Sequence, residues 1–577
     1  MFFNSPLWIG LVVVALLISL IVFSVRPMLA FAIAAAVLFL SDAISQTAFL
    51  SGFINQALIS LILLLLCSLA VEKTVFVKNI GKTFFTTNKV LNLVKLCVSS
   101  VFASGITNNT AVVSVIMASI NQNKLLIPSR LLLPLSYASI LGGTLTLVGT
   151  STNMIVAGFV EDAGLPVLNM FSTTPIAIFV IVSCLIIMIP AALFLLPSHQ
   201  REDLAVNAYF IETKVAADSK LIGKSVINNG FRNLNALYLA EVIREGVLYS
   251  PVEPSFKIQA NDKLLFVGDL NDLAMLNQFD GLLVLNESLA SINNNLVEVV
   301  ITADASISGK TIKQSDFRSQ FNASVVGVRR GEQKLSGGLG RIILKPGDAL
   351  LLAVGSDFQN RHNLKNNFIV LSSEYSVSCL DIKKSTLVLL GFLAVLGAAS
   401  LSLLPLMKGL MLLLGVYVAS GVIGFSEIRR RLPFEILIVV GSALAIAHAM
   451  FESGLATMLG DILLTLSQGY GVWGAFVAVY LVTLLLTELI TNNAAAALIF
   501  PISIALTEHF GVSYMPFVMA VMFGASASFL SPFGYQTNLM VFSVGKYKII
   551  DYIKFGLPIS LTYSVTVLWV IPLIYPF

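Results

Sequence analysis

Two stretches of sequence decide the fold: ITNNTAVVSV at 106–115 and ELITNNAAAALIFPI at 488–502. In each, the tripeptide Thr-Asn-Asn, at 107–109 and at 491–493, interrupts a largely apolar segment. Further along each half lies a second matched interruption, GTSTNMIV at 149–156 and GYQTNLMV at 534–541. Four interruptions, paired in order across two halves, indicate an internal repeat.

Polar residues inside apolar segments predict a binding site. Backbone inside a bilayer leaves its helix only where protein or a water-filled cavity satisfies the freed N–H and C=O groups. Paired interruptions in corresponding halves are the best sequence indication of a transporter site. Half-helix N-termini favour an anion, whereas C-terminal carbonyls with Asn, Thr and Ser oxygens suit Na⁺. The alternative, that Asn and Thr only join helices by hydrogen bonds, accounts less well for a doubled pattern.

The composition identifies the class of protein. Of the 577 residues, 57% are hydrophobic and only 11% are charged, and the mean hydropathy is +0.90. A soluble domain is about 25% charged, so this is an integral membrane protein, expected in the inner or plasma membrane in contact with lipid. The net charge of +4 is small and dispersed, which excludes a nucleic-acid partner.

Apolar runs fill both ends of the chain, and several reach the roughly 20 residues that a spanning helix needs. We predict a polytopic α-helical membrane protein built from two inverted repeats. The runs at 92–121 and 472–507 are interpreted as re-entrant hairpins, and those at 130–160 and 515–545 as broken helices. The remaining runs lie near 7–24, 28–42, 52–71, 173–197, 385–404, 409–425, 434–453 and 556–576.

Charge is concentrated in residues 198–372, which hold 18 of the 35 Lys and Arg residues and 18 of the 31 Asp and Glu residues. A soluble insert is therefore predicted between two membrane halves, 1–197 and 373–577. Basic residues in short loops mark the cytoplasmic side. They follow the runs that end at 71 and 425 and precede the last run, which places the insert in the cytoplasm and both termini outside. The first run has no signal-peptide features and is expected to remain as the first span.

The insert contains its own repeat. LIGKSVINNGFRNLNALYLAEVIREG at 221–246 is similar to ISGKTIKQSDFRSQFNASVVGVRRGE at 307–332, and NDKLLFVG at 261–268 is similar to GDALLLAVG at 347–355. Two tandem α+β domains are predicted, 198–287 and 288–372. The matched positions are all 86 residues apart: Gly223 and Gly309, Phe231 and Phe317, Arg232 and Arg318, and Asp262 and Asp348.

The four interrupted segments, with PLSYASILGGTLTLVGTSTNMIV at 134–156 and SFLSPFGYQTNLMVF at 528–542, resemble the signature segments of the divalent anion/sodium symporter family. The likeness covers both membrane halves. It implies a secondary active transporter, not an enzyme, in which a dimeric scaffold stays fixed while a transport domain carries Na⁺ and a divalent anion across like an elevator. In that family a Ser-Asn-Thr tripeptide at each hairpin tip contacts substrate and sodium.

Carried over to this chain, the resemblance implies two sets of site residues. The residues expected to bind the anion are Asn108, Asn109, Thr110, Asn492, Asn493, Ala494, Thr152 and Thr537. The residues expected to bind sodium, between each tip and the nearby helix break, are Asn109, Gly149, Thr150, Asn153, Asn493, Gly534 and Asn538.

The sequence departs from the family pattern in three ways. Asn replaces Ser in both tips, Ala494 replaces the second Thr, and GTSTN and GYQTN stand where dicarboxylate carriers show a Pro-Pro-Asn break. The combination is more similar to the sulfate-transporting branch, so sulfate is the leading substrate and a C4 dicarboxylate the alternative. Neutral Asn and Thr sites leave proton coupling open beside sodium.

The insert resembles the TrkA-C (RCK C-terminal) domain, which implies either a regulatory ligand or a spacing role. This raises the alternative of an RCK-regulated potassium channel, but neither LVGTSTN nor FGYQTN supplies a TVGYG-like filter. Two further groups are candidates. Glu488, four residues before Asn492, is expected to brace the hairpin tip or to add negative field for Na⁺. His448 and Glu452 are interpreted as a packed or pore-facing pair.

Overall fold

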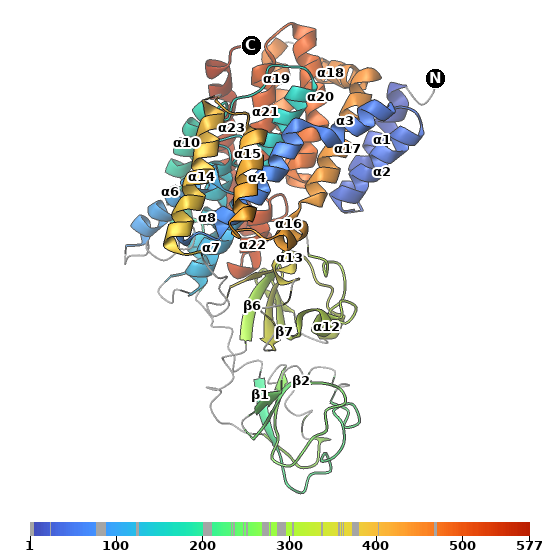
Figure 1. The fold of residues 1–577 in the computed structure, drawn as a ribbon, viewed down its shortest axis with the longest axis vertical. Coiled ribbons are helices and arrows are strands. Elements are labelled where there is room, and N and C mark those ends of the chain that lie inside the picture. Colours follow the sequence, from blue (N-terminus) through green and yellow to red (C-terminus); the bar gives the residue numbers. More distant parts are fainter. Residues whose placement is uncertain are drawn as a thin grey trace.

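The computed structural model describes residues 5–23, 25–76, 88–122, 126–199, 210–231, 234, 237–245, 247–249, 252–267, 276, 278–284, 296–302, 305–335, 339–355, 358, 361, 363–371, 380–401, 403–466 and 470–577. It consists of a helical body with two small sheets stacked below it (Figure 1). Within these residues, seven helical segments are long and apolar enough to cross a membrane. The polytopic α-helical architecture predicted from the sequence is confirmed.

The first membrane half runs from a Ser5-capped helix to a long span that leads into the insert. Its predicted run at 52–71 is part of two helices, because the Asn55 side chain accepts from the backbone N–H groups of Ala57 and Leu58 and so starts a new helix. The helices of this half are α1 (Pro6–Ile21), α2 (Pro27–Leu40), α3 (Gln46–Ile54), α4 (Gln56–Glu72), α6 (Lys89–Ile106), α7 (Asn109–Gln122), α8 (Pro128–Gly143), α9 (Ser151–Asp162) and α10 (Thr174–Phe194).

The second membrane half follows the same order, including a hairpin, a broken helix and a long final span. It also contains two short helices, α16 and α18, that the apolar runs did not predict. Its helices are α14 (Ile382–Ser400), α15 (Leu406–Ala419), α16 (Phe425–Arg431), α17 (Phe434–Glu452), α18 (Leu455–Leu466), α19 (Gly471–Leu489), α20 (Asn492–Phe510), α21 (Tyr514–Ser526), α22 (Gln536–Val544) and α23 (Ile549–Ile574).

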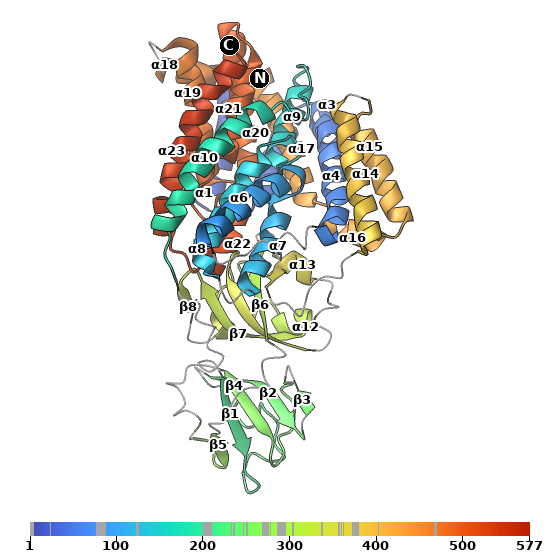
Figure 2. The ribbon, with the colours of Figure 1, turned by 90° about the vertical axis from the view of Figure 1, so that its left-hand side faces the viewer.

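The helices form two packed groups. One contains the hairpins and the broken helices: α6 packs on α8, α10 on α23, and α19 and α20 on α21. The other contains α2 and α3 packed on α17, and α4 packed on α14 and α15. The groups meet where α4 contacts α9 and where α17 and α18 contact α20. Figure 2 shows the hairpin α6–α7 toward the sheets and α19–α20 toward the opposite end, as inverted repeats require.

The insert forms two antiparallel five-stranded sheets with the same strand order. In each sheet an arginine reaches a buried aspartate, Arg244 to Asp262 and Arg330 to Asp348. The predicted division at 287 falls in 285–295, outside the described residues. The first sheet contains β1 (Phe210–Val215), β2 (Tyr238–Arg244), β3 (Val247–Tyr249), β4 (Lys263–Val267) and β5 (Leu282–Val284). The second contains β6 (Leu296–Ile301), β7 (Ala323–Arg330), β8 (Gln333–Leu335), β9 (Ala349–Val354) and β10 (Phe368–Val370), with the helices α12 (Phe317–Phe321) and α13 (Leu364–Asn367) and the 3-10 turn Leu339–Arg341.

The second sheet docks on the short helix α22. The Gly331 N–H group donates to Ser543 Oγ at 3.0 Å, and Val300, Ala349 and Leu371 belong to the same apolar core as the membrane helices. A Cβ atom on Gly331 would lie 2.7 Å from the Phe542 ring. The insert therefore contacts a helix that also carries candidate site residues.

Candidate functional site

The first hairpin tip presents its second asparagine to the other half of the molecule. Asn108 caps α7 by accepting from the Thr110 N–H group at 3.0 Å. Asn109 is buried; its Nδ2 donates to the Tyr535 hydroxyl at 2.7 Å, and its Oδ1 accepts from Ser104. Thr110 Oγ1 donates to Gln536 Oε1 at 3.3 Å. The tip at the start of α7 thus contacts the start of α22.

The second tip makes the reciprocal contact. Asn493 Oδ1 accepts from Thr152 Oγ1 at 3.0 Å and from Ser151 Oγ at 3.4 Å, so the start of α20 contacts the start of α9. Asn492 turns inward and accepts from Thr487 at 2.9 Å. Ala494 is fully buried. Of the three residues at this tip, Asn493 is the one that reaches the opposite repeat.

The two helix breaks have the same internal geometry. In the first, Asn153 Nδ2 donates to the Thr146 carbonyl at 3.1 Å, and the Gly149 N–H group donates to Thr146 Oγ1 at 3.0 Å. The second break, 385 positions later, repeats both contacts. There Asn538 Nδ2 donates to the Ser531 carbonyl at 3.3 Å, and the Gly534 N–H group donates to Ser531 Oγ at 3.1 Å. The asparagines satisfy carbonyls that the breaks release from their helices.

Glycine is needed at both breaks because the backbone passes close to its neighbours. A Cβ atom on Gly149 would lie 2.5 Å from the Gly143 carbonyl oxygen, and one on Gly534 would collide with Ser528 Oγ. Glycine at each break therefore allows the backbone to leave the helix and turn without a steric collision.

The four helix N-termini are joined into one cluster. The start of α7 contacts that of α22, the start of α20 contacts that of α9, and Thr150 Oγ1 lies 3.3 Å from the Tyr535 hydroxyl, which joins the two pairs. Of the residues expected from the sequence, Asn109, Thr150, Thr152 and Asn493 meet in this cluster. The side chains of Asn492, Thr537 and Asn538 bond to other partners, Thr487, Ser136 and the helix break. Helix N-termini carry partial positive charge, so the arrangement can hold an anion.

Glu488 is the carboxylate behind the second break. Its Oε1 accepts from the backbone N–H groups of Phe529 and Leu530, both at 2.8 Å. The alternatives left by the sequence were bracing of the tip and a negative field for Na⁺; these contacts are bracing contacts, made to the helix break and not to Asn492. His448 has a partner that the sequence did not predict, because its Nε2 lies 2.8 Å from Asp162 Oδ2. Its pairing with Glu452 stays a prediction.

Sequence reasoning missed several residues that complete the cluster. Ser136 Oγ in α8 donates to Asn538 Oδ1 at 2.7 Å and lies 2.9 Å from Thr537 Oγ1. Ser139 lies 3.0 Å from Ser104, and Tyr535 bridges the two halves. Ser136 and Ser139 lie on α8, which is almost wholly buried. Both belong to the stretch 134–156 that was quoted for the family resemblance, and this position could have indicated them. Alignment of GTSTN with GYQTN would have identified Tyr535 as the residue that replaces Thr150 in the second repeat.

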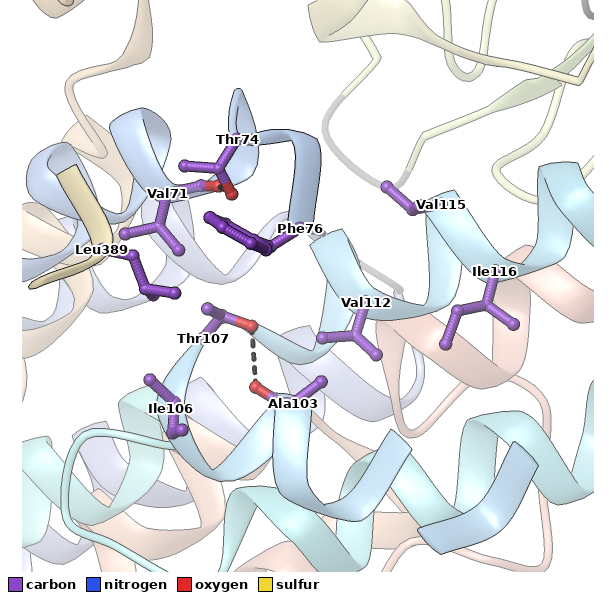
Figure 3. Close-up of a pocket in the computed structure, with 10 residues that line it drawn as sticks. All are labelled: Val71, Thr74, Phe76, Ala103, Ile106, Thr107, Val112, Val115, Ile116 and Leu389. Carbon is purple, nitrogen blue, oxygen red and sulfur yellow. Dashed lines mark hydrogen bonds between the residues drawn. The ribbon is translucent and has the colours of Figure 1, made fainter. Parts of the chain in front are cut away.

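A cavity of about 130 Å³ lies beside the first tip, between α6 and α7 on one side and α4 and α14 on the other (Figure 3). Its two polar side chains, Thr74 and Thr107, follow the ends of α4 and α6 and donate to the carbonyls of Val71 and Ala103 in those helices. The rest of its lining is apolar. This cavity lies between the two helix groups, and the described residues that line it include no charged side chain.

The fold and the cluster together define a membrane transporter. The chain belongs to the citrate transporter family, whose model matches residues 8–512. A Chlamydomonas reinhardtii protein named as a regulator of the sulfur deprivation response is 31% identical over 535 residues, 88% of this chain and 92% of the relative. An uncharacterized transporter of Synechocystis is 26% identical over 569 residues, 94% of this chain and 92% of the relative. Sodium/sulfate cotransporter 1 of Chlamydomonas reinhardtii is 26% identical over 376 residues, 62% of this chain and 42% of the relative.

Proposed function

We propose that this chain is a secondary active transporter that couples the symport of a small divalent anion, sulfate, to sodium. The observation that carries the proposal is the convergence of four helix N-termini, from both repeats, on one neutral cluster. Asn109, Asn493, Thr150 and Thr152 supply amide and hydroxyl groups there, and none of the contacts that join the termini involves a charged side chain. Neutral donors and helix dipoles suit a compact dianion.

Sodium is proposed as the co-transported ion. Carbonyl, amide and hydroxyl oxygens gather at each break, where Thr146 and Asn153 face Gly149, and Ser531 and Asn538 face Gly534. A hard cation takes such oxygen ligands, and broken helices supply them. The name of the sodium/sulfate cotransporter relative supports the same pair of ions.

An elevator mechanism is part of the proposal. The hairpins and breaks belong to one helix group, which meets the other group mainly along α9 and α20. Movement of the first group against the second would carry the whole cluster across the membrane. The family resemblance adds a homodimeric scaffold, a cytoplasmic insert and a regulatory ligand at the TrkA-C-like sheets as further proposals.

A carboxylate substrate is the second candidate, because the matching family model is that of citrate transporters. Uptake of labelled sulfate, succinate and citrate into proteoliposomes, with and without an inward sodium gradient, separates the candidates. We expect sodium-dependent sulfate uptake that excess sulfate abolishes and succinate inhibits weakly. Sulfate uptake driven by a proton gradient alone would overturn the choice of ion, and strong competition by succinate or citrate would overturn the choice of substrate.

A further inference from the structure

The two helix breaks differ at one position that matters for the site. Thr150 immediately precedes α9, and Tyr535 immediately precedes α22, 385 residues later. The two backbones are nearly identical there, with φ −137° and ψ 144° at Thr150 and φ −135° and ψ 137° at Tyr535. Because the conformations match, the difference between the two halves lies in the side chains.

The Tyr535 side chain crosses from one repeat to the other. Its hydroxyl accepts from Asn109 Nδ2 at 2.7 Å and lies 3.3 Å from Thr150 Oγ1, so it meets the starts of α7 and α9 while its own backbone caps α22. Side chains at the starts of two helices, α7 and α9, therefore meet at one phenol oxygen. An electronegative atom is favoured there, so the tyrosine hydroxyl occupies a place that would also suit an anion oxygen.

We propose that Tyr535 determines which anions the site accepts, by limiting their length. This inference rests on the proposed anion transport. A C4 dicarboxylate separates its charges by several ångströms and requires a set of donors at each end, whereas sulfate presents all its oxygens to one set. The tyrosine ring extends from the start of α22 to the starts of α7 and α9. In this proposal the second carboxylate of a longer anion would extend across the same interval. With threonine at both positions the interval would be open.

Two substitutions separate the ring from the hydroxyl. Tyr535→Thr gives the second break the side chain of the first and removes the ring, and we expect succinate to compete with sulfate about tenfold better, the effect of one net hydrogen bond gained at the far carboxylate. Tyr535→Phe keeps the ring, and we expect weaker sulfate uptake with an unchanged ratio of succinate to sulfate inhibition. Tyr514→Phe is the matched control, because its hydroxyl donates to the Pro166 carbonyl far from the cluster.

The measurement is competition by succinate against labelled sulfate in proteoliposomes, expressed as a ratio, together with the thermal stability of each variant in detergent. An unchanged ratio in a folded Tyr535→Thr protein overturns the inference. An increased ratio of succinate to sulfate inhibition in Tyr535→Phe also overturns the inference. If the Tyr535→Thr protein does not fold, the result for Tyr535→Phe alone tests the inference. Absence of sulfate uptake by the unsubstituted protein overturns the proposed function instead.

Discussion

At the scale of single residues, Asn109 and Asn493 are the two tip residues whose side chains reach the opposite repeat. Replacing either with alanine removes an amide from the cluster while leaving the hairpin backbone intact. We expect Asn109→Ala and Asn493→Ala each to abolish sodium-dependent uptake. The free energy of unfolding should fall by only about 1–2 kcal/mol, the usual range for buried hydrogen bonds. Uptake in proteoliposomes and thermal unfolding in detergent check this.

The control for these variants is Asn228→Ala, which truncates an exposed asparagine of the insert. It should transport as the unsubstituted protein does. Uptake at the unsubstituted level by both tip variants would contradict the assignment of the site, whereas loss of folding in both would show that the amides serve mainly to pack the hairpins.

The repeat in the sequence singled out Asn109 and Asn493, and the structure shows that both side chains contact the opposite repeat. Their role in binding stays a prediction. The repeat was not sufficient to predict Tyr535. The partner of that residue, Asn109, lies 426 positions away, and no local pattern indicates a contact over that distance. Comparison of the aligned breaks would have found the asymmetry, since Thr150 and Tyr535 occupy equivalent positions.

At the scale of elements, the second helix break depends on Glu488. Two backbone N–H groups, those of Phe529 and Leu530, donate to one carboxylate oxygen. Glu488→Ala would leave both donors unpaired, at a cost of about 1–3 kcal/mol each, and we expect a clear loss of thermal stability together with uptake. Glu488→Gln keeps an acceptor oxygen and should be milder in both measurements.

Glu508→Ala serves as the control, because Glu508 is exposed at the end of α20. If Glu488→Gln lost transport as completely as Glu488→Ala yet remained as stable as the unsubstituted protein, the negative charge itself would be needed. That result would favour the other interpretation of this residue, a negative field for Na⁺.

The hairpins and long spans followed from the length and apolarity of their runs, but the short elements did not. α16 contains three consecutive arginines, which in the sequence were evidence for a loop. α18 is a short helix of 12 residues in the interval between two apolar runs. The division between α3 and α4 depends on the capping by Asn55, and capping has no signature in hydropathy. Length and mean apolarity therefore predict spans, whereas a side-chain cap decides where α4 starts.

At the scale of the whole molecule, the two sheets offer an internal comparison. Gly331 and Gly347 have positive φ and abut α22, where a Cβ atom would lie 2.7 Å from Phe542 and from Leu539 respectively. The equivalent residues of the first sheet, 86 positions earlier, are Glu245 and Asn261, which also have positive φ. Both sheets thus have the left-handed backbone conformation at these two positions. Only the sheet that contacts α22 has glycine there.

We therefore expect Gly331→Ala and Gly347→Ala to weaken docking of the second sheet, through a backbone cost of about 1–2 kcal/mol plus the collision with α22. Glu245→Ala and Asn261→Ala are the controls, because these residues already carry a Cβ at positive φ and belong to the first sheet rather than to the sheet that docks on α22. Docking can be followed by the protection from hydrogen exchange at the start of α23, beside the ion pair between Glu332 Oε2 and Lys548 Nζ, which lie 2.9 Å apart. Equal protection in all four alanine variants would contradict the close fit.

The same ion pair predicts a weak dependence of docking on pH. The hydrogen bond from the Lys548 ammonium lowers the pKa of the Glu332 carboxyl. The pair therefore favours docking above the ordinary carboxyl pKa of about 4.3, and its contribution is lost as pH falls through the lowered value. Both side chains are exposed, so the effect is small. The protection of the α22–α23 segment from hydrogen exchange, corrected for the intrinsic rate at each pH, should be constant from pH 8 to pH 5. A large loss of protection near pH 6 would show that other groups control docking.

The insert should not behave as a single removable unit. The first sheet contacts the second through the hydrogen bond from Arg318 Nη1 to the Val252 carbonyl, whereas the second places Val300, Ala349 and Leu371 in the core of the membrane helices.

Deleting residues 210–284 with a short linker should leave sodium-dependent uptake and thermal stability close to those of the full chain. Deleting residues 210–371 would expose the α22 surface at Leu539 and Phe542, so we expect lower stability and reduced uptake. The two deletions are compared by thermal unfolding and by uptake in proteoliposomes. Equal uptake by the two deletion proteins would show that the second sheet is dispensable. Complete loss of uptake after deletion of 210–284 alone would show that the membrane helices depend on the first sheet, although the described residues connect it to the second sheet.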